Sequence, residues 1–222
     1  MVTAAEQGQL TRTRLMDATA ELIAERGWGA VTTRMVAERA GLRPGLVHYH
    51  FHSVTDLLID SSLRAMQTEV TRILQPALTG ADQEALAALI QAGASWGTGP
   101  GGPGPRAAVF VEMLLAARRH ERLRSALAGM LTGARAAVGQ LVRADGPGAE
   151  GQATAEVLLA AFDGLLLHRL LDPALGDLAL GGPAVAAPLR RMVGIPESNA
   201  LVNGANDDPS PRGSPRSDRP DR

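Results

Sequence analysis

Three histidines alternate within five residues, and imidazole is the commonest metal ligand in proteins. They are His48, His50 and His52. On a strand all three would share one face and could hold zinc, whereas on a helix only His48 and His52 align, four residues apart. No acidic third ligand is obvious for the helical arrangement. We therefore expect no metal and no cofactor, and we keep a His-based metal enzyme as an alternative.

Residue types that several enzyme classes need are absent. The chain has no Cys, and all 22 of its Lys and Arg residues are Arg. This excludes Cys nucleophiles, thiolate metal sites, Schiff-base lysines and phosphate-loop lysines. The Gly-rich stretch 97–104 follows no predicted strand, and no Ser, His and Asp are arranged for nucleophilic catalysis. We predict no catalytic residues and no enzyme activity.

The spacing of residues 32–51 is typical of a helix-turn-helix. Thr32 can cap a first short helix through its hydroxyl, and Pro44 can open a second one, where its missing N–H costs nothing. Small residues between them allow close helix packing and a tight turn. These residues are Ala37, Ala40 and Gly41. The second helix has the right size to enter a DNA major groove, which is about 12 Å wide.

Residues 10–60 resemble the N-terminal domain of TetR-family transcriptional regulators. The matching features are Gly27-Trp28, Thr32-Thr33-Arg34, Ala37-x-x-Ala40-Gly41, Tyr49-His50-Phe51 and Asp56-Leu57-Leu58, in that order. Elsewhere the resemblance is one of architecture, with a softer match at Asp163-Gly164-Leu165. The resemblance implies a homodimeric repressor whose two recognition helices read a palindromic operator on double-stranded DNA, and which a small effector releases.

The resemblance also implies roles for individual residues. Thr33 aligns with a phosphate-contacting position and Arg34 with a base- or phosphate-reading one. The exposed side of the recognition helix would carry Pro44, Gly45, Leu46, His48 and Tyr49, with His50 near the DNA backbone. Arg43 replaces a common Ser or Thr cap, and its planar fork suits guanine or phosphate. Trp28 and Phe51 align with core positions that fasten the recognition helix.

The chain departs from the family pattern at three further positions. The family often has Tyr, Lys and Thr where this chain has His48, Val54 and Leu46. A charged phosphate contact is missing at Val54, and Leu46 can make only apolar contacts, for example with a thymine methyl. The departures imply a distinct operator. They also motivate a second alternative, a small-molecule-binding protein that has lost specific DNA binding.

The elements that must position these residues are helices. Apolar residues recur at three- and four-residue steps, and no run alternates as a strand does. We predict an all-α fold, in which a three-helix helix-turn-helix domain precedes a larger helical ligand-binding and dimerisation domain. About nine helices are expected, at 10–26, 33–40, 44–50, 54–75 (ended by Pro76), 83–96, 106–117, 120–143, 151–171 and 184–194. The expected divisions are a flexible arm (1–9), a DNA-binding domain (10–53), a ligand and dimer domain (54–196) and a disordered tail (197–222).

The predicted helix 151–171 is apolar nearly all round, which is typical of a helix buried on more than one side. The resemblance implies that it forms a four-helix dimer interface together with the helix near 184–194. The alternative is a central helix of a monomer.

Met and aromatic side chains recur at helical spacing in the middle helices and could line a ligand pocket. They are Met66, Trp96, Phe110 and Met113, followed by Phe162 and His168. Side chains of this kind are more often core, so the expectation of a small apolar effector rests mainly on the resemblance.

The formal charge of −1 argues against bulk coating of nucleic acid but allows a local basic face. Whether Arg12 and Arg14 contribute to that face stays open. No apolar run reaches the roughly 18–20 residues that span a bilayer, and the N-terminus lacks a secretory pattern. We expect a cytoplasmic protein with no membrane partner.

Overall fold

The computed structural model describes residues 3–80, 83–97, 104–142, 149–172 and 183–195. Within these ranges the chain is all-α, with nine α-helices, one short 3-10 turn and no strand. The predicted fold class is therefore confirmed. The predicted tail, 197–222, lies outside the described residues.

The N-terminal head consists of α1 (Ala4–Arg26), the 3-10 turn η1 (Trp28–Ala30), α2 (Thr33–Arg39) and α3 (Gly45–His50). The expectation of a flexible arm over residues 1–9 is wrong from residue 4 onward. Thr3 and Glu6 form a capping box, in which the Thr3 hydroxyl accepts the Glu6 N–H at 3.2 Å and the Glu6 carboxylate accepts the Thr3 N–H at 2.6 Å. This pairing satisfies two N–H groups that a helix start otherwise leaves unpaired, so α1 begins there.

Local signals fix the turn between α2 and α3. The Thr32 hydroxyl accepts the Met35 N–H at 3.3 Å and so caps α2, as the sequence predicts. Gly41 has a φ of +64°, a left-handed conformation that glycine adopts without steric cost. The Leu42 N–H then donates to the Ala37 carbonyl at 2.9 Å, which closes the end of α2.

Six helices form the rest of the molecule: α4 (Val54–Thr79), α5 (Gln83–Ala94), α6 (Pro105–Ala117), α7 (Glu121–Val142), α8 (Ala149–Leu171) and α10 (Pro183–Met192). Most predicted boundaries lie within two residues of these. The exception is the end of the fourth helix, because α4 continues through Pro76 to Thr79. The expectation that Pro76 ends this helix is wrong: a proline has a helical φ, so it costs a hydrogen bond and crowds the carbonyl four residues earlier without always terminating a helix.

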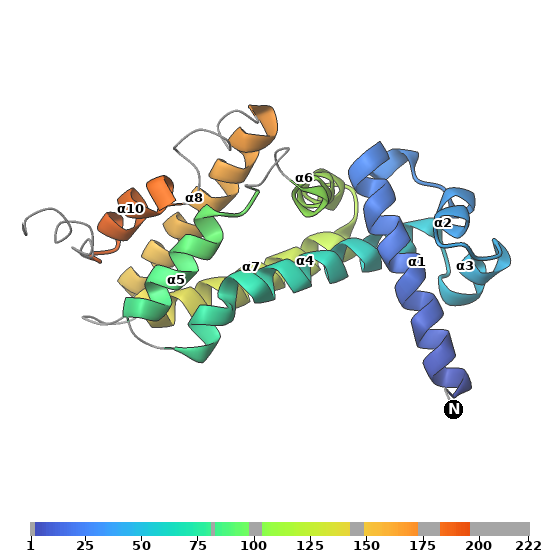
Figure 1. The fold of residues 1–222 in the computed structure, drawn as a ribbon, viewed down its shortest axis with the longest axis horizontal. Helices are drawn as coiled ribbons and strands as arrows, with labels where there is room; N and C mark the ends of the chain where they lie inside the picture. The colour runs from blue at the N-terminus through green and yellow to red at the C-terminus, as the bar shows by residue number, and fades with distance from the viewer. Residues whose placement is uncertain (1–2, 81–82, 98–103, 143–148, 173–182, 196–222) are drawn as a thin grey trace, which may run out of the picture.

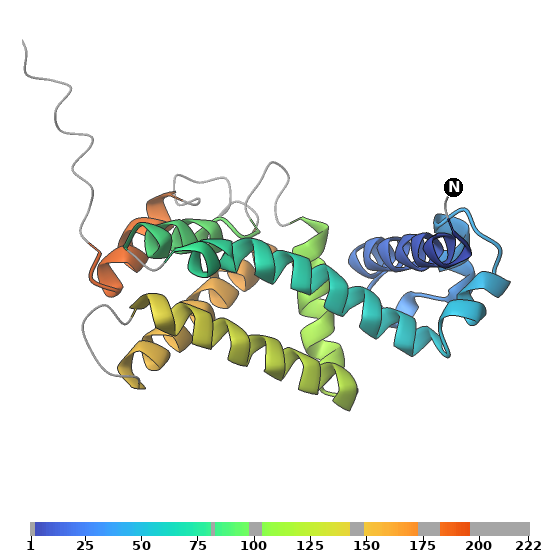
Figure 2. The same cartoon turned by 90° about the horizontal axis from the view of Figure 1, so that it is seen from below.

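The molecule is elongated, with the head at one end (Figure 1). Helix α4 runs from the head into the body with α7 beside it, while α5, α8 and α10 gather at the far end (Figures 1 and 2). Helix α6 crosses between the head and the body, packing against α1, α4 and α7. The head core includes Leu57 and Leu58 from α4 and Val109 from α6, so the body helices complete it.

A close helix contact in the body gives a test of this packing. A Cβ placed on Gly93 of α5 would lie 2.4 Å from the ring of Phe162 on α8, whereas one on Gly133 of α7 would meet nothing within 4 Å. We expect Gly93→Ala to lower the melting temperature by several degrees, because overpacking a buried contact costs roughly 1–3 kcal/mol.

The matched control is Gly133→Ala, which should keep or raise the melting temperature, since alanine favours an exposed helix position. Thermal unfolding followed by circular dichroism measures both. A Gly93→Ala protein as stable as the Gly133→Ala protein would contradict the observed α5–α8 contact.

Candidate DNA interface and ligand cavity

Helix α3 lies at the outer end of the head (Figures 1 and 2). Its inward side is anchored by Val47, which is 1% exposed, and by Phe51 directly after it, which is 4% exposed. Its outward side carries Tyr49, which is 81% exposed, together with His48. An aromatic side chain so fully exposed on a short helix is available to a partner.

The structure brings the sequence-predicted DNA residues to one end of the head. Arg34, Arg43, Pro44, Gly45, His48 and Tyr49 are exposed, and Thr33, Leu46 and His50 are partly buried. The His50 ring packs edge-on against Tyr49, with 5.0 Å between the ring centroids. No acidic residue lies in α3 or among the three residues before it.

Three exposed arginines of the head make no hydrogen bond or ion pair among the described residues: Arg26, in the last turn of α1, and the two sequence-predicted DNA residues Arg34 and Arg43. The other three make contacts within the protein. Arg14 donates to the Ala40 carbonyl at 2.8 Å, and Arg39 pairs with Glu21 and Glu25. Arg12 pairs with Asp60 at 2.5 Å. Arg12 and Arg14 therefore have structural roles, whereas Arg34 and Arg43, the sequence-predicted DNA arginines, remain free among the described residues to contact an anion.

The three alternating histidines do not come together as a site. Helix α3 ends at His50, so His52 lies beyond it and the four-residue alignment with His48 does not form. Over the described ranges, no three His, Asp or Glu side chains are grouped so that they could hold a metal ion.

None of the described helices combines the length and the hydrophobicity that a membrane-spanning helix needs.

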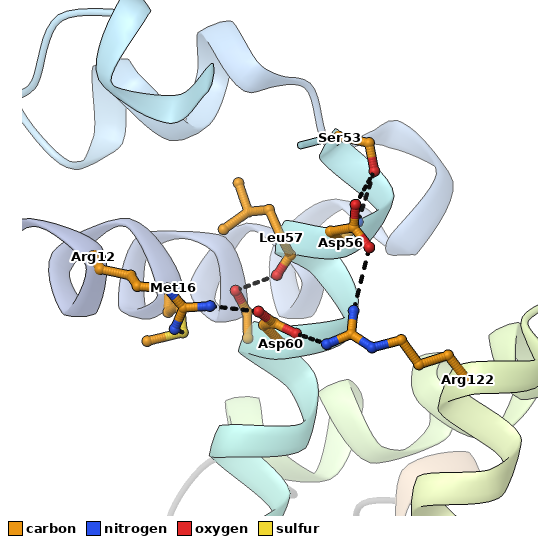
Figure 3. Close-up of polar contacts among 8 residues, drawn as sticks. Arg12, Met16, Ser53, Asp56, Leu57, Asp60 and Arg122 are labelled. Carbon is orange, nitrogen blue, oxygen red and sulfur yellow. Dashed lines mark hydrogen bonds and ion pairs between the residues drawn. The ribbon is translucent and has the colours of Figure 1, made fainter. Parts of the chain in front are cut away.

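A polar network joins the head to the body at the start of α4 (Figure 3). The Asp60 carboxylate accepts from Arg12 of α1 and from Arg122 of α7, and Arg122 also reaches Asp56 at 3.2 Å. The Arg12 guanidinium also lies 4.7 Å from the centroid of the Phe51 ring. Asp60 of α4 thus ties α1 of the head to α7 of the body.

A second contact joins the head to α6. The Trp28 N–H donates to the Glu112 carboxylate at 2.7 Å, and the Trp28 ring lies against His120, with 6.0 Å between the ring centroids. Trp28 packs on both the head core and the neighbouring body core. It therefore lies at the junction between them and not beneath the recognition helix, where the resemblance to the family suggests it. Phe51 does occupy that position.

A mostly apolar cavity lies among the body helices. The space open to the centres of water-sized molecules is about 100 Å³, and about 10–15 Å³ on this measure suffices for one water. The cavity can therefore hold a small organic molecule. Its apolar lining comes from four helices and from Trp96, which follows α5. The helical residues are Met66, Val70, Ile73 and Leu74 of α4; Phe110 and Leu114 of α6; Leu127, Met130, Leu131 and Ala134 of α7; and Leu159 and Phe162 of α8.

Four of the six residues predicted for the pocket line this cavity: Met66, Trp96, Phe110 and Phe162. The other two do not. Met113 is fully buried in the core between α6 and its neighbours, and His168 is exposed on α8. Helical periodicity places a residue on a face, but which face borders empty space depends on the packing of neighbouring helices.

Two carboxylates also line the cavity, and the sequence reasoning did not single out either as a ligand residue. Glu69 is buried and accepts from Arg72 at 2.5 Å and from Arg106 at 3.2 Å. Asp163 has no hydrogen bond or ion pair among the described residues, and burial raises its pKa to about 6. The available signal was an isolated acidic residue in an otherwise apolar stretch of helix.

One side of α8 and α10 exposes apolar side chains. Val157 and Leu171 of α8 are 53% and 85% exposed, and Met192 of α10 is 64% exposed. Ala153 and Ala160 lie exposed along the same helix, and Ala184 and Pro188 follow the four-residue spacing toward Met192. Exposed apolar residues at helical spacing on α8 and on α10 are suited to contact with another protein.

Comparisons with known proteins agree with this architecture. The family model described as bacterial regulatory proteins, tetR family, matches residues 15–60, and that described as tetracyclin repressor-like, C-terminal domain, matches residues 81–195. No curated protein matches the chain significantly.

Several solved structures have the same fold. The multidrug binding protein EbrR, solved with imidazole, is 26% identical with a TM-score of 0.59, over 84% of this chain and 92% of that one. A transcriptional regulator from Rhodococcus sp. is 24% identical with a TM-score of 0.66, over 82% and 94% of the two chains. A TetR-family member from Streptomyces coelicolor is 24% identical with a TM-score of 0.65, over 84% and 98%. The last two similarities show the fold alone.

The partly buried Asp163 carboxylate in the cavity gives a stability prediction. The folded state holds the Asp163 proton to about pH 6, whereas the unfolded chain releases it near 3.8. The folded state therefore loses stability as pH rises between these values, and the full penalty is present above them. Glu69, the other acid of the cavity, is already paired with two arginines.

We expect Asp163→Asn to be more stable than the wild type at pH 8, by roughly 1–2 kcal/mol after allowing for partial exposure. The difference should narrow as pH falls to about 4.5. Urea unfolding across this range measures it, with Glu156→Gln, an exposed carboxylate change on the same helix, as control. An Asp163→Asn protein that is less stable than the wild type at pH 8 would show that the carboxylate has a stabilising partner.

Proposed function

The chain belongs to the TetR family of bacterial regulatory proteins, and we propose that it is a homodimeric repressor, released from a palindromic operator when a small, mostly apolar ligand fills the body cavity. Members of this family are DNA-binding transcriptional regulators. The observation that carries the proposal is the exposed helix α3, anchored by buried residues on its inward side and accompanied by two arginines, Arg34 and Arg43, that pair with no described residue.

The chemistry of the head suits DNA. Helix α3 can enter a major groove, where Tyr49 and His48 would reach base edges or phosphates. Arg34, at the start of α2, and Arg43, before α3, have guanidinium groups free for bidentate contact with phosphate or guanine. The missing family Lys at Val54 leaves these two arginines as the main charged contacts.

Dimerisation would use the exposed apolar side of α8 and α10. Two copies pairing through Val157, Leu171 and Met192 would bury these side chains and present two heads related by a two-fold axis. A palindromic operator has the same symmetry, so each head would read one half-site.

Ligand binding would reach the DNA through α4. Its first turns contribute Leu57 and Leu58 to the head core, and its later turns contribute Met66 and Ile73 to the cavity wall. A ligand that favours one position of α4 therefore favours one position of the head, which is what a release mechanism requires. Arg122 connects α7, another wall of the cavity, to Asp56 and Asp60 at the same end of α4.

The DNA-contact assignment can be tested with single substitutions. In a dimer each change removes two contacts, so we expect Arg34→Ala and Arg43→Ala each to weaken binding to the DNA upstream of the protein's own gene by about tenfold or more. The slope of binding against salt concentration should also become shallower, because fewer counterions are released. Fluorescence anisotropy of labelled DNA measures both.

Arg135→Ala is the control, since Arg135 lies on α7 of the body and, among the described residues, pairs only with Glu156 of α8, at 4.0 Å. It should bind DNA as the wild type does. If the wild-type protein binds its upstream DNA no better than random sequence, the alternative of a ligand-binding protein without specific DNA binding replaces the proposal.

The proposed role of Arg122 in transmitting ligand binding to the DNA-binding head can be tested separately. Arg122→Met removes the charged link to α4 and keeps the apolar stem, so we expect ligand and DNA each still to bind. A compound that stabilises the wild type and weakens its DNA binding should weaken that of Arg122→Met several-fold less.

The matched control is Arg124→Met on the same helix, because Arg124 pairs only with Glu121 of its own helix among the described residues. In this variant the compound should weaken DNA binding as much as it does in the wild type. Equal weakening of DNA binding in Arg122→Met and the wild type would show that α4 and α6 carry the signal without this ion pair.

A further inference from the structure

The cavity lining is unusual in its charge and in its aromatic content. Three of the six aromatic side chains in the sequence line it: Trp96, Phe110 and Phe162. The Trp96 and Phe110 rings pack on each other at a tilt of 55°, with 5.0 Å between their centroids. Arg169, itself 3% exposed, donates to the Trp96 carbonyl at 2.7 Å and so holds that part of the wall in place. The aromatic wall is preformed.

The only unpaired charge among the described lining residues of the cavity is the negative charge of Asp163. Glu69 is neutralised, because Arg72 and Arg106 both bind its carboxylate. Asp163 is the other acid of the lining, and no described residue gives it a hydrogen bond or an opposite charge. Among the described residues, no Arg or His belongs to the lining. A ligand in the cavity therefore meets one uncompensated carboxylate among apolar and aromatic side chains.

We propose that the cavity binds an organic cation, an ammonium group that carries apolar substituents. This inference rests on the proposed function only in taking the cavity as the effector site. The positive charge would pair with Asp163 and face the aromatic rings, while the apolar substituents would contact the Met and Leu side chains of α4 and α7.

Physical chemistry favours this class over neutral and anionic molecules. An unpaired carboxylate shielded from water is unfavourable until an opposite charge reaches it. Aromatic faces attract cations, most strongly where water is excluded, and quaternary ammonium ligands are bound this way in aromatic cages. An anion would face Asp163 without any cation in the lining. At pH 7.5 the carboxylate is ionised, since its pKa is about 6.

The test uses two probes of the same shape. Phenyltrimethylammonium and tert-butylbenzene differ by a nitrogen in place of a carbon, and so by one positive charge. Binding of each to the full-length protein at pH 7.5 is measured by protein-observed NMR titration. We expect the cation to bind the wild type about tenfold more tightly or better, which corresponds to about 1.4 kcal/mol.

Asp163→Asn should abolish this preference while still binding tert-butylbenzene, because the apolar walls are unchanged. Glu156→Gln is the matched control: it removes one exposed carboxylate from the same helix outside the cavity and should keep the preference. Resonances of the Trp96 indole should shift with either probe if the cavity is the site.

Equal or tighter binding of tert-butylbenzene by the wild type would overturn the proposal, and so would an Asp163→Asn protein that keeps the preference for the cation. These results are separable from the fate of the proposed function, which is tested by binding to upstream DNA without any probe. Specific DNA binding together with a preference for the neutral probe would contradict only the proposal of a cationic ligand. A protein that prefers the cation but binds no specific DNA loses only the regulatory role.

Discussion

The structure depends on the continuity of α4. It is one helix of 26 residues, about 39 Å long at 1.5 Å per residue, and it belongs to two cores at once. Leu57 at one end is buried in the head, and Ile73 toward the other end borders the cavity. A packed helix moves largely as a unit, so in the proposed mechanism a change at the cavity wall would displace the head together with α4. The ion pairs of Asp60 with Arg12 of α1 and Arg122 of α7 lie at the end of α4 nearest the head, so such a movement would change them.

The helix-turn-helix of the head was largely predictable from sequence because its signals are local. A threonine cap, a glycine with positive φ and a proline before the last short helix each act within a few residues, and the structure shows each in its expected place. The missed start of α1 was also local in origin. Thr3 and Glu6 have capping-box spacing, but the small and polar residues around them are also typical of an unstructured N-terminus.

The cavity was less predictable because it is made by residues from five segments of the chain. Met113 and Phe110 are one turn apart on α6, yet only Phe110 borders the cavity. Nothing in the spacing of these residues says which lies next to space and which next to a neighbouring helix. Asp163 illustrates the same limit, since its lack of a partner is a property of the packed body and not of α8. Sites at which a local rule is broken are often those that function requires.

The central claim is that two copies of α3, paired through α8 and α10, read one face of a duplex together. Hydroxyl-radical footprinting of the full-length protein on its own upstream DNA tests this directly. Two protected stretches related by symmetry, centred about one helical turn apart on the same face, are the predicted result. A single protected stretch, or none at moderate salt with a folded dimer, would contradict the account.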